Sequence, residues 1–328
     1  MTNEEIFSEE QINSICSNIP EIEAVEELRV TFRKKRVNYY LILLSIIVVA
    51  GAIFYFLNAL EFAIFSGIIL LVLAIIFWYI YVNPAYKKLK DLFKEVIINH
   101  YICSLLPGAT YEPAKYHSLH SYYESNLFTS NVDRHNGANY VKGVFDKTEL
   151  SFSYMHTEYK EVTHSKNGTK TTWHTIFEGV FMQADSNKNF EGKTVVLPDT
   201  AEKMFGSIGK WMQKNSGNPV GQMVYMENVK FEKEFVVYST DPVEARYLLT
   251  PKIQEQILHL KHFIKRDVRL SFVNNHIFIA ISRGNLFNLD TSLSFNNTST
   301  LKYYMKDVIE LLSLVNILDL NTRIWGKN

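Results

Sequence analysis

Asp241, Glu244 and Arg246 lie close together in the sequence and are the residues best suited to chemistry. Two carboxylates beside a guanidinium would suit acid–base catalysis or the binding of a charged ligand. The same spacing also has a structural explanation. Asp241 followed by Pro242 is typical of a helix start, with a capping side chain and then proline at the first helical position. Glu244 then falls in the first turn, and Arg246 can pair with a nearby carboxylate. We favour the structural interpretation and keep the three residues as alternative catalytic candidates.

The ten histidines include two pairs at helical spacing, His117 with His120 and His259 with His262. Each pair could place two metal ligands on one helix face. Zinc sites need three or four ligands, and no Cys or carboxylate is spaced to complete either pair. The sequence also contains no Gly-x-Ser-x-Gly, Walker or dinucleotide-binding fingerprint. We therefore expect neither a metal ion nor a cofactor.

Composition excludes one class of partner. The 34 basic and 34 acidic side chains cancel, whereas a general nucleic-acid-binding protein carries a basic field. Cys16 and Cys103 are the only cysteines, so no disulfide framework is expected.

Two apolar segments predict a membrane hairpin over residues 39–83. They span about residues 40–57 and 62–82 and contain no Asp, Glu, Lys or Arg. About 20 apolar residues are needed to cross the hydrocarbon of a bilayer. Only Asn58 to Glu61 connects the two segments, so they must run antiparallel. A buried pair of soluble helices is the alternative.

Basic residues flank both segments on the sides away from the connecting turn, which has none. Positive residues favour the cytoplasmic side, so we expect both chain termini in the cytoplasm. Orientation alone explains these residues, and recruitment of anionic membrane lipid is a further hypothesis. The flanking residues are Arg33, Lys34, Lys35, Arg36, Lys87, Lys88 and Lys90.

The remaining sequence divides into three parts. Residues 1–38 are predicted to form an acidic, amphipathic helical leader with a basic end, and we expect its helix to continue into the first span. Residues 84–108 form an amphipathic juxtamembrane helix that Pro84 kinks. Residues 109–328 form a cytoplasmic α+β domain with a mainly antiparallel sheet, because strand patterns with hairpin turns alternate with helical patterns.

Individual elements of this domain follow from local signals. Asn167-Gly168 predicts a hairpin between strands 149–162 and 171–181, which would place Tyr154 opposite Phe181 and Val162 opposite Trp173. Strands are also expected at 193–197, 222–226, 229–239, 268–273 and 276–282. Helices are expected from 199, from 241, from 250 and over 301–320.

The stretch from Phe231 to Pro251 resembles the signature of a bacterial membrane-protein family named domain of unknown function 3137. Phe177–Phe181 and the Val268–Ile281 hairpin are similar to the same family, and so is the order of acidic leader, membrane hairpin and cytoplasmic domain. The resemblance implies a bacterial plasma (inner) membrane location. The family has no established activity, so the resemblance assigns no catalytic residues to this chain. This chain has Phe287-Asn288 where the family tends toward Phe-Glu.

These observations lead us to expect a membrane-anchored, non-enzymatic protein whose cytoplasmic domain binds a protein partner or a ligand close to the membrane. An enzyme with a site at Asp241, Glu244 and Arg246 is one alternative. Self-association through the two spans is another, because small residues permit close helix approach. These small residues are Ser45, Gly51, Ser66 and Gly67.

Overall fold

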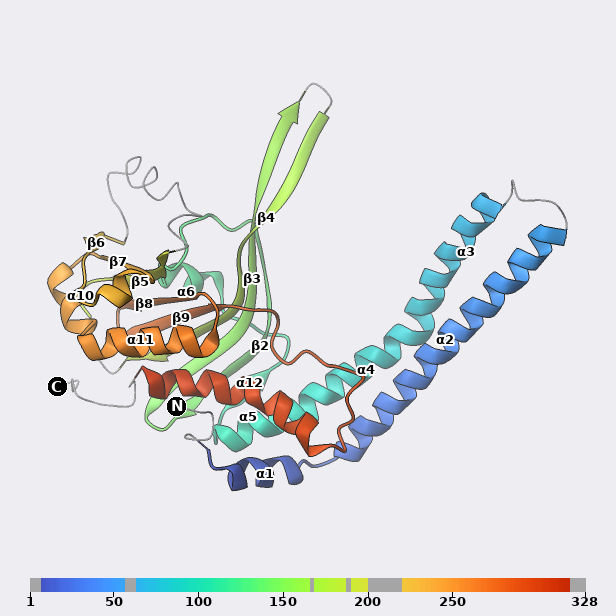
Figure 1. Cartoon of the computed structure of the whole chain (residues 1–328), viewed down its shortest axis with the longest axis horizontal. Helices are drawn as coiled ribbons and strands as arrows, with labels where there is room; N and C mark the ends of the chain where they lie inside the picture. The colour runs from blue at the N-terminus through green and yellow to red at the C-terminus, as the bar shows by residue number, and fades with distance from the viewer. Residues whose placement is uncertain (1–6, 57–62, 166–167, 187–189, 200–219, 319–328) are drawn as a thin grey trace. The chain divides into compact units, whose positions relative to one another are not determined.

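A computed structural model of the chain describes residues 7–56, 63–165, 168–186, 190–199 and 220–318. The chain divides into two compact units. Unit 1 comprises residues 1–6, 102–286 and 307–328, and unit 2 comprises residues 7–101 and 287–306. The architecture confirms the expected α+β class, with two long apolar helices followed by antiparallel strands and helices (Figure 1).

Unit 2 is built from long helices. Its elements are α1 (Glu9–Ser17), α2 (Ile22–Phe56), α3 (Ala63–Phe77), η3 (Trp78–Val82), α4 (Asn83–Phe93), η4 (Lys94–Ile98) and the first residues of α5 (Asn99–Leu105). Ser8 caps α1 through a capping box with Gln11. Helix α2 runs without interruption from the leader into the first apolar segment, as the sequence predicts.

A π-helical turn, η3, precedes Pro84. The Asn83 main-chain N–H reaches back five residues to the Trp78 carbonyl, and the helix then continues as α4. Proline cannot donate a main-chain hydrogen bond, and its ring crowds the preceding turn. Widening that turn is one way for a helix to accept proline. The kink expected at Pro84 stays a prediction.

A buried ion pair joins α2 to the segment 287–306 within unit 2. Arg29 donates from Nε and Nη2 to both carboxylate oxygens of Glu26, at 2.8 and 2.6 Å. Glu26 also accepts hydrogen bonds from the Ser294 hydroxyl and the Phe295 main-chain N–H, both at 2.9 Å. Arg29 Nη1 donates to the Thr291 carbonyl at 3.2 Å. We call this arrangement the Glu26 clamp.

The Arg29 guanidinium, with the Phe295 and Ser294 donors, lowers the pKa of Glu26 to about 2. Because this pKa lies below its usual value, the clamp stabilises the fold fully above pH about 4.5. The contribution is lost as the pH falls through about 2.

Aromatic side chains also join the segment 287–306 to α4 and α5. Phe93 of α4 packs against Phe295 and Tyr304, with ring centroids 5.6 and 4.8 Å apart. The Tyr101 hydroxyl donates to the Leu301 carbonyl at 3.1 Å. Residues 287–306 are therefore part of the helical unit, although more than 180 residues separate them from α5 in sequence.

Unit 1 contains one nine-stranded antiparallel sheet in the order β1-β2-β3-β4-β9-β8-β5-β7-β6. The strands are β1 (Thr110–Glu112), β2 (Arg134–Phe145), β3 (Thr148–Ser165), β4 (Gly168–Asp185), β5 (Thr194–Pro198), β6 (Gln222–Val224), β7 (Phe235–Ser239), β8 (Val268–Val273) and β9 (His276–Ser282). Among its described residues the helices are α6 (Leu119–Glu124), α9 (Val229–Glu232), α10 (Pro242–Leu248) and α11 (Pro251–Ile264). Helix α12 (Thr298–Ile317) starts in unit 2 and enters unit 1 at Asp307.

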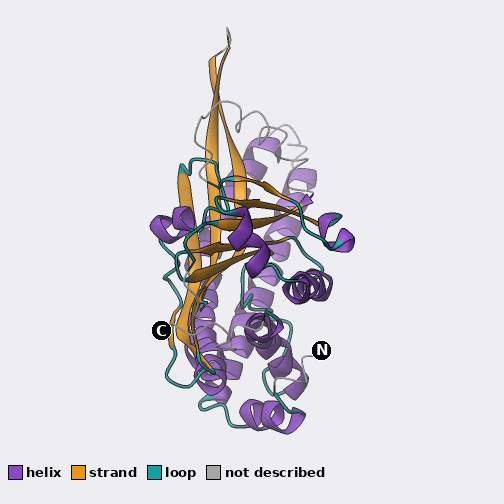
Figure 2. Ribbon diagram, turned by 90° about the vertical axis from the view of Figure 1, so that its left-hand side faces the viewer, coloured by secondary structure: helices purple, strands orange, loops and turns teal. Residues whose placement is uncertain are grey.

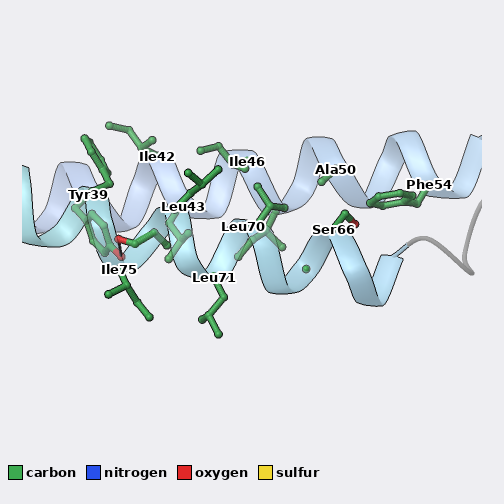
Figure 3. A pocket seen from close by; sticks show the side chains of 15 residues that line it. Tyr39, Ile42, Leu43, Ile46, Ala50, Phe54, Ser66, Leu70, Leu71 and Ile75 are labelled. Atoms are coloured by element: carbon green, nitrogen blue, oxygen red, sulfur yellow. Dashed lines mark hydrogen bonds between the residues drawn. The ribbon is translucent and has the colours of Figure 1, made fainter.

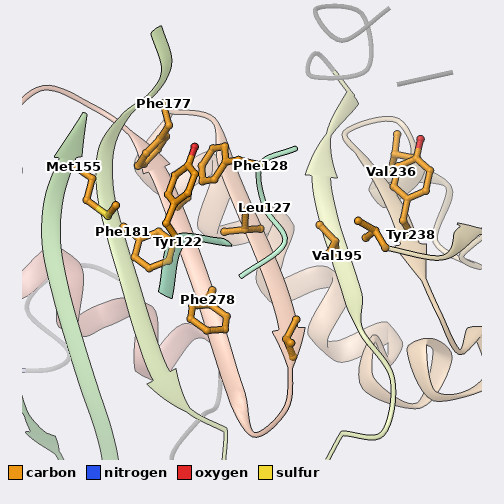
Figure 4. Packing of buried hydrophobic residues seen from close by; sticks show 13 residues of the cluster. Tyr122, Leu127, Phe128, Met155, Phe177, Phe181, Val195, Val236, Tyr238 and Phe278 are labelled. Atoms are coloured by element: carbon orange, nitrogen blue, oxygen red, sulfur yellow. The ribbon is translucent and has the colours of Figure 1, made fainter. Parts of the chain in front are cut away.

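Aromatic side chains from α6 and neighbouring strands form a core on the sheet (Figure 4). The Tyr122 ring stacks on Phe128 at a centroid distance of 4.6 Å, and its hydroxyl bonds Thr157 Oγ1 at 3.1 Å. Phe128 in turn lies 4.8 Å from Phe177. The polar tip of Tyr122 is thereby satisfied while its ring is buried.

Two sequence predictions about strands are wrong. Residues 229–232 form helix α9, because the Asn228 side chain accepts hydrogen bonds from the N–H groups of Lys230 and Phe231 and so caps a helix. In the long hairpin, Tyr154 pairs with Val180 and Val162 with Thr171. Ser165 pairs directly with Gly168, which is a tighter connection than predicted, and the register shifts again at Thr157/Glu158.

Other predictions are confirmed. Helices begin at Pro242 and Pro251, and the 268–273/276–282 hairpin forms. The last predicted helix forms as α12, and its apolar residues at helical spacing are buried: Tyr304, Val308, Leu311 and Val315. The helix expected from residue 199 lies outside the described residues.

We predict that Glu26→Gln weakens the Glu26 clamp by about 3 kcal/mol, because it leaves the buried Arg29 charge without a carboxylate. Hydrogen exchange of the detergent-solubilised protein should then accelerate about a hundredfold at residues 291–297. Glu27→Gln, at the neighbouring exposed position, is the matched control and should leave exchange unchanged. Equal exchange in both variants would contradict the clamp.

Candidate functional site

The Asp241 side chain caps α10. Its Oδ1 accepts hydrogen bonds from the main-chain N–H groups of Val243 and Glu244, at 2.8 and 3.1 Å. Pro242 occupies the first helical position, where its missing N–H is not needed.

Glu244 holds a neighbouring turn. Its carboxylate oxygens accept hydrogen bonds from the main-chain N–H groups of Glu191 and Gly192, at 2.9 and 2.7 Å. A Cβ added at Gly192 would lie 2.7 Å from Glu244 Oε2, so glycine permits this approach. Together with Thr240, which accepts a hydrogen bond from Lys193 N at 2.8 Å, Glu244 fixes the entry into β5.

Arg246 lies apart from this arrangement. Its side chain is exposed, and in the described part of the chain it forms no ion pair within 4.0 Å. The structure therefore brings Asp241 and Glu244 together as acceptors of main-chain hydrogen bonds. The carboxylate pairing expected for Arg246 is not formed with any described residue.

The paired histidines do not converge. His117 is buried, with Nδ1 at 2.8 Å from Ser153 Oγ and Nε2 at 2.9 Å from Ser151 Oγ, whereas His120 is exposed. His259 and His262 are both exposed on α11. Among the described residues, no three His, Cys, Asp or Glu side chains gather to hold a metal ion.

The feature of unit 1 best suited to binding is the distal part of the β3–β4 hairpin, here called the β-ribbon (residues 158–165 and 168–178). Figure 1 and Figure 2 show the two strands extending beyond the rest of the sheet. Pairing with β2 ends at Glu158, and pairing with β9 begins at Gly179. Between these points, no described strand covers either edge of the ribbon.

Beyond Glu158, the outer edge of β3 therefore has no neighbouring strand among the described residues. The Lys160 N–H points to this edge, where it donates to the Asp133 carboxylate at 2.8 Å. Alternate residues of a strand point their main-chain groups to the same edge, so Val162 and His164 also direct theirs outward. An edge of this kind is a template for the addition of another strand.

Each face of the β-ribbon carries an aromatic side chain. On one face Trp173 is 38% exposed, and the Arg134 guanidinium lies over its ring at 3.8 Å. On the other face Tyr159 is 37% exposed and stacks on His174 at 4.9 Å. His174 pairs directly with Tyr159, and its Nε2 makes a diagonal contact with Glu161 Oε2 at 3.0 Å.

Sequence reasoning found the hairpin but not its projection. The projection follows from strand length: β3 and β4 have 18 residues each, while their neighbours β2 and β9 have 12 and 7. The excess must extend beyond the neighbours.

Comparisons with known proteins give one family and one structure. A family model described as "Protein of unknown function (DUF3137)" matches residues 175–320, which confirms the family resemblance. A search of curated proteins finds no match to the chain. The chain is also similar to the crystal structure of the mycobacterial trehalose monomycolate transport factor A, TtfA, with 10% identity and a TM-score of 0.30. This similarity covers 64% of this chain and 89% of that one.

The buried His117 should make unit 1 sensitive to mild acid. Burial lowers the pKa of His117 to about 3, so the folded protein holds it neutral while the unfolded chain binds a proton below pH about 6.5. Its contribution to stability is complete above that pH and is lost as the pH falls toward 3, at about 1.4 kcal/mol per pH unit.

We expect urea unfolding between pH 7 and 5, followed by circular dichroism, to show this slope in the full chain. His117→Gln should reduce the slope, whereas the exposed control His120→Gln should retain it. Burial also lowers the pKa of His135, which is present in both variants. An unchanged slope in His117→Gln would contradict a neutral, buried His117.

Proposed function

We propose that this chain, similar to the DUF3137 family over residues 175–320, is a membrane-anchored protein that binds a protein partner through the β-ribbon. One observation carries the proposal: both edges of the ribbon lack a neighbouring strand among the described residues. An isolated two-stranded hairpin is at best marginally stable in water. Addition of a partner strand would satisfy its outward main-chain groups.

The side chains support this role. Trp173 with Arg134, and Tyr159 with His174, are rigid, partly exposed groups on the two ribbon faces. Aromatic residues and arginine dominate the energetics of many protein interfaces. In this proposal the partner strand pairs with β3 at Val162 and His164, and the aromatic side chains bind the partner's side chains.

Membrane anchoring is supported by the two apolar helices. Each is long and apolar enough to cross a bilayer, and only 6% of its most apolar 18-residue stretch is buried inside the protein. A core helix of a soluble protein would be mostly covered by other residues. In the proposed topology the connecting turn lies outside a bacterial inner membrane and both termini lie in the cytoplasm, next to the basic residues that flank the spans.

Partner binding is tested by site-specific photo-crosslinking at native expression. A photoreactive phenylalanine derivative at Tyr159 should crosslink to one protein species, and the same group at the exposed Val243 on α10 is the control. Val162→Pro removes one outward N–H and should lower the Tyr159 crosslink at least about tenfold. Absence of a crosslinked protein, or a crosslink unaffected by Val162→Pro, would contradict the proposal.

Topology is tested by thiol labelling. Cys103 is exposed on α5 and Cys16 is buried, so Cys103 is the reporter. A membrane-impermeant maleimide should label Cys103 only after spheroplast lysis, whereas Asn58→Cys in the connecting turn should react in intact spheroplasts. Labelling of Cys103 in intact spheroplasts would reverse the proposed orientation.

A further inference from the structure

An elongated apolar groove runs between α2 and α3 of unit 2 (Figure 3). Its volume is about 530 Å³, within the range of about 300–1,000 Å³ that is typical of ligand sites. The lining extends along α2 from Tyr39 to Phe54, a length of about 22 Å at 1.5 Å per residue. A long, narrow space of this kind suits a hydrocarbon chain better than a compact ligand.

The described lining of the groove offers no polar group to a ligand. Tyr39 closes one end, where its hydroxyl donates to the Ala74 carbonyl at 3.1 Å and its ring lies 5.1 Å from Trp78. The other lining side chains are apolar except Ser66. A polar ligand would lose its hydration in this groove and gain no hydrogen bonds in return.

Small residues leave the groove open. Gly67 lines it, and a Cβ added at Gly67 would meet no atom within 4 Å. Packing between α2 and α3 does not require glycine at this position. The space is therefore available to another molecule and is not filled by close helix contact.

Two cations stand at the Tyr39 end of the groove. Lys35 and Arg36 lie four and three residues before Tyr39, on the same helix face. Both are half-buried, with Lys35 Nζ 5.3 Å from the ring centre of Tyr81 and the Arg36 guanidinium 5.6 Å from that of Phe32. Neither forms an ion pair with a carboxylate in the described part of the chain.

We propose that the groove binds one acyl chain of an anionic phospholipid, whose phosphate lies between Lys35 and Arg36. Charge complementarity selects this occupant, because the apolar groove ends at two cations that lack carboxylate partners. Arg33 and Lys34 carry the same charge but face away from the groove, on the side that includes Val30 and Val37. The inference rests on the membrane anchoring proposed above and does not involve the β-ribbon.

The test uses the full chain in lipid nanodiscs, with photoactivatable phosphatidylglycerol and phosphatidylcholine probes that carry the reactive group on one acyl chain. Co-migration with the nanodiscs, measured first, tests membrane insertion by itself. Phosphatidylglycerol should then label peptides of α2 and α3 about tenfold more than phosphatidylcholine. Equal labelling by the two probes would overturn the proposal.

Matched variants separate the groove from general lipid contact. Gly67→Leu should abolish most of the labelling, while Gly51→Leu, at a position that also meets no atom within 4 Å but does not line the groove, should not. Lys35→Gln with Arg36→Gln should remove the preference for phosphatidylglycerol, and Arg33→Gln with Lys34→Gln should keep it. These charge variants leave the lining intact, so they decide the question even if Gly67→Leu fails to insert.

A second copy of the chain is the competing occupant. If Gly67→Cys forms a disulfide-linked dimer in nanodiscs and the lining is not labelled by lipid, a helix of another copy fills the groove and the proposal is overturned. Lipid labelling of Gly67→Cys without dimer formation would support it.

Discussion

Main-chain hydrogen bonding is the constraint on which this structure depends. Residues 40–56 and 63–82 are helical throughout, so their main-chain groups bond within the chain, as a hydrocarbon environment would require. Where Pro84 removes a donor, the helix continues through the π turn η3. In unit 1, Asp241 and Glu244 supply acceptors to α10 and to the turn at Gly192. The outward main-chain groups of the β-ribbon are the exception, because no described strand pairs with them.

Local signals made much of the fold predictable. The length and apolarity of the segments within residues 40–82 predict two long helices. Proline after a capping residue predicts the starts of α10 and α11. Apolar residues that recur every three or four positions indicate which side of α12 is buried. These features depend on a few neighbouring residues, so no long-range information is needed.

Features that depend on distant contacts could not be predicted. Phe295 joins the helical unit because Glu26 accepts a hydrogen bond from its main-chain N–H, across more than 260 residues of sequence. The register of the long hairpin depends on the tightness of its turn and on the shift at Thr157/Glu158. Among the candidate residues, Asp241 acts as the cap that its spacing indicates. The open space beside Gly67 depends on how α2 and α3 pack together, so it could not be predicted from the sequence near Gly67.

The central claim is that a partner strand completes the β-ribbon. Hydrogen exchange at Val162 and His164 tests it most directly, because their outward amides have no acceptor among the described strands. We predict fast exchange of these amides in the purified chain and slow exchange in native membranes, where the proposed partner would be bound. Equally fast exchange in native membranes would contradict the claim.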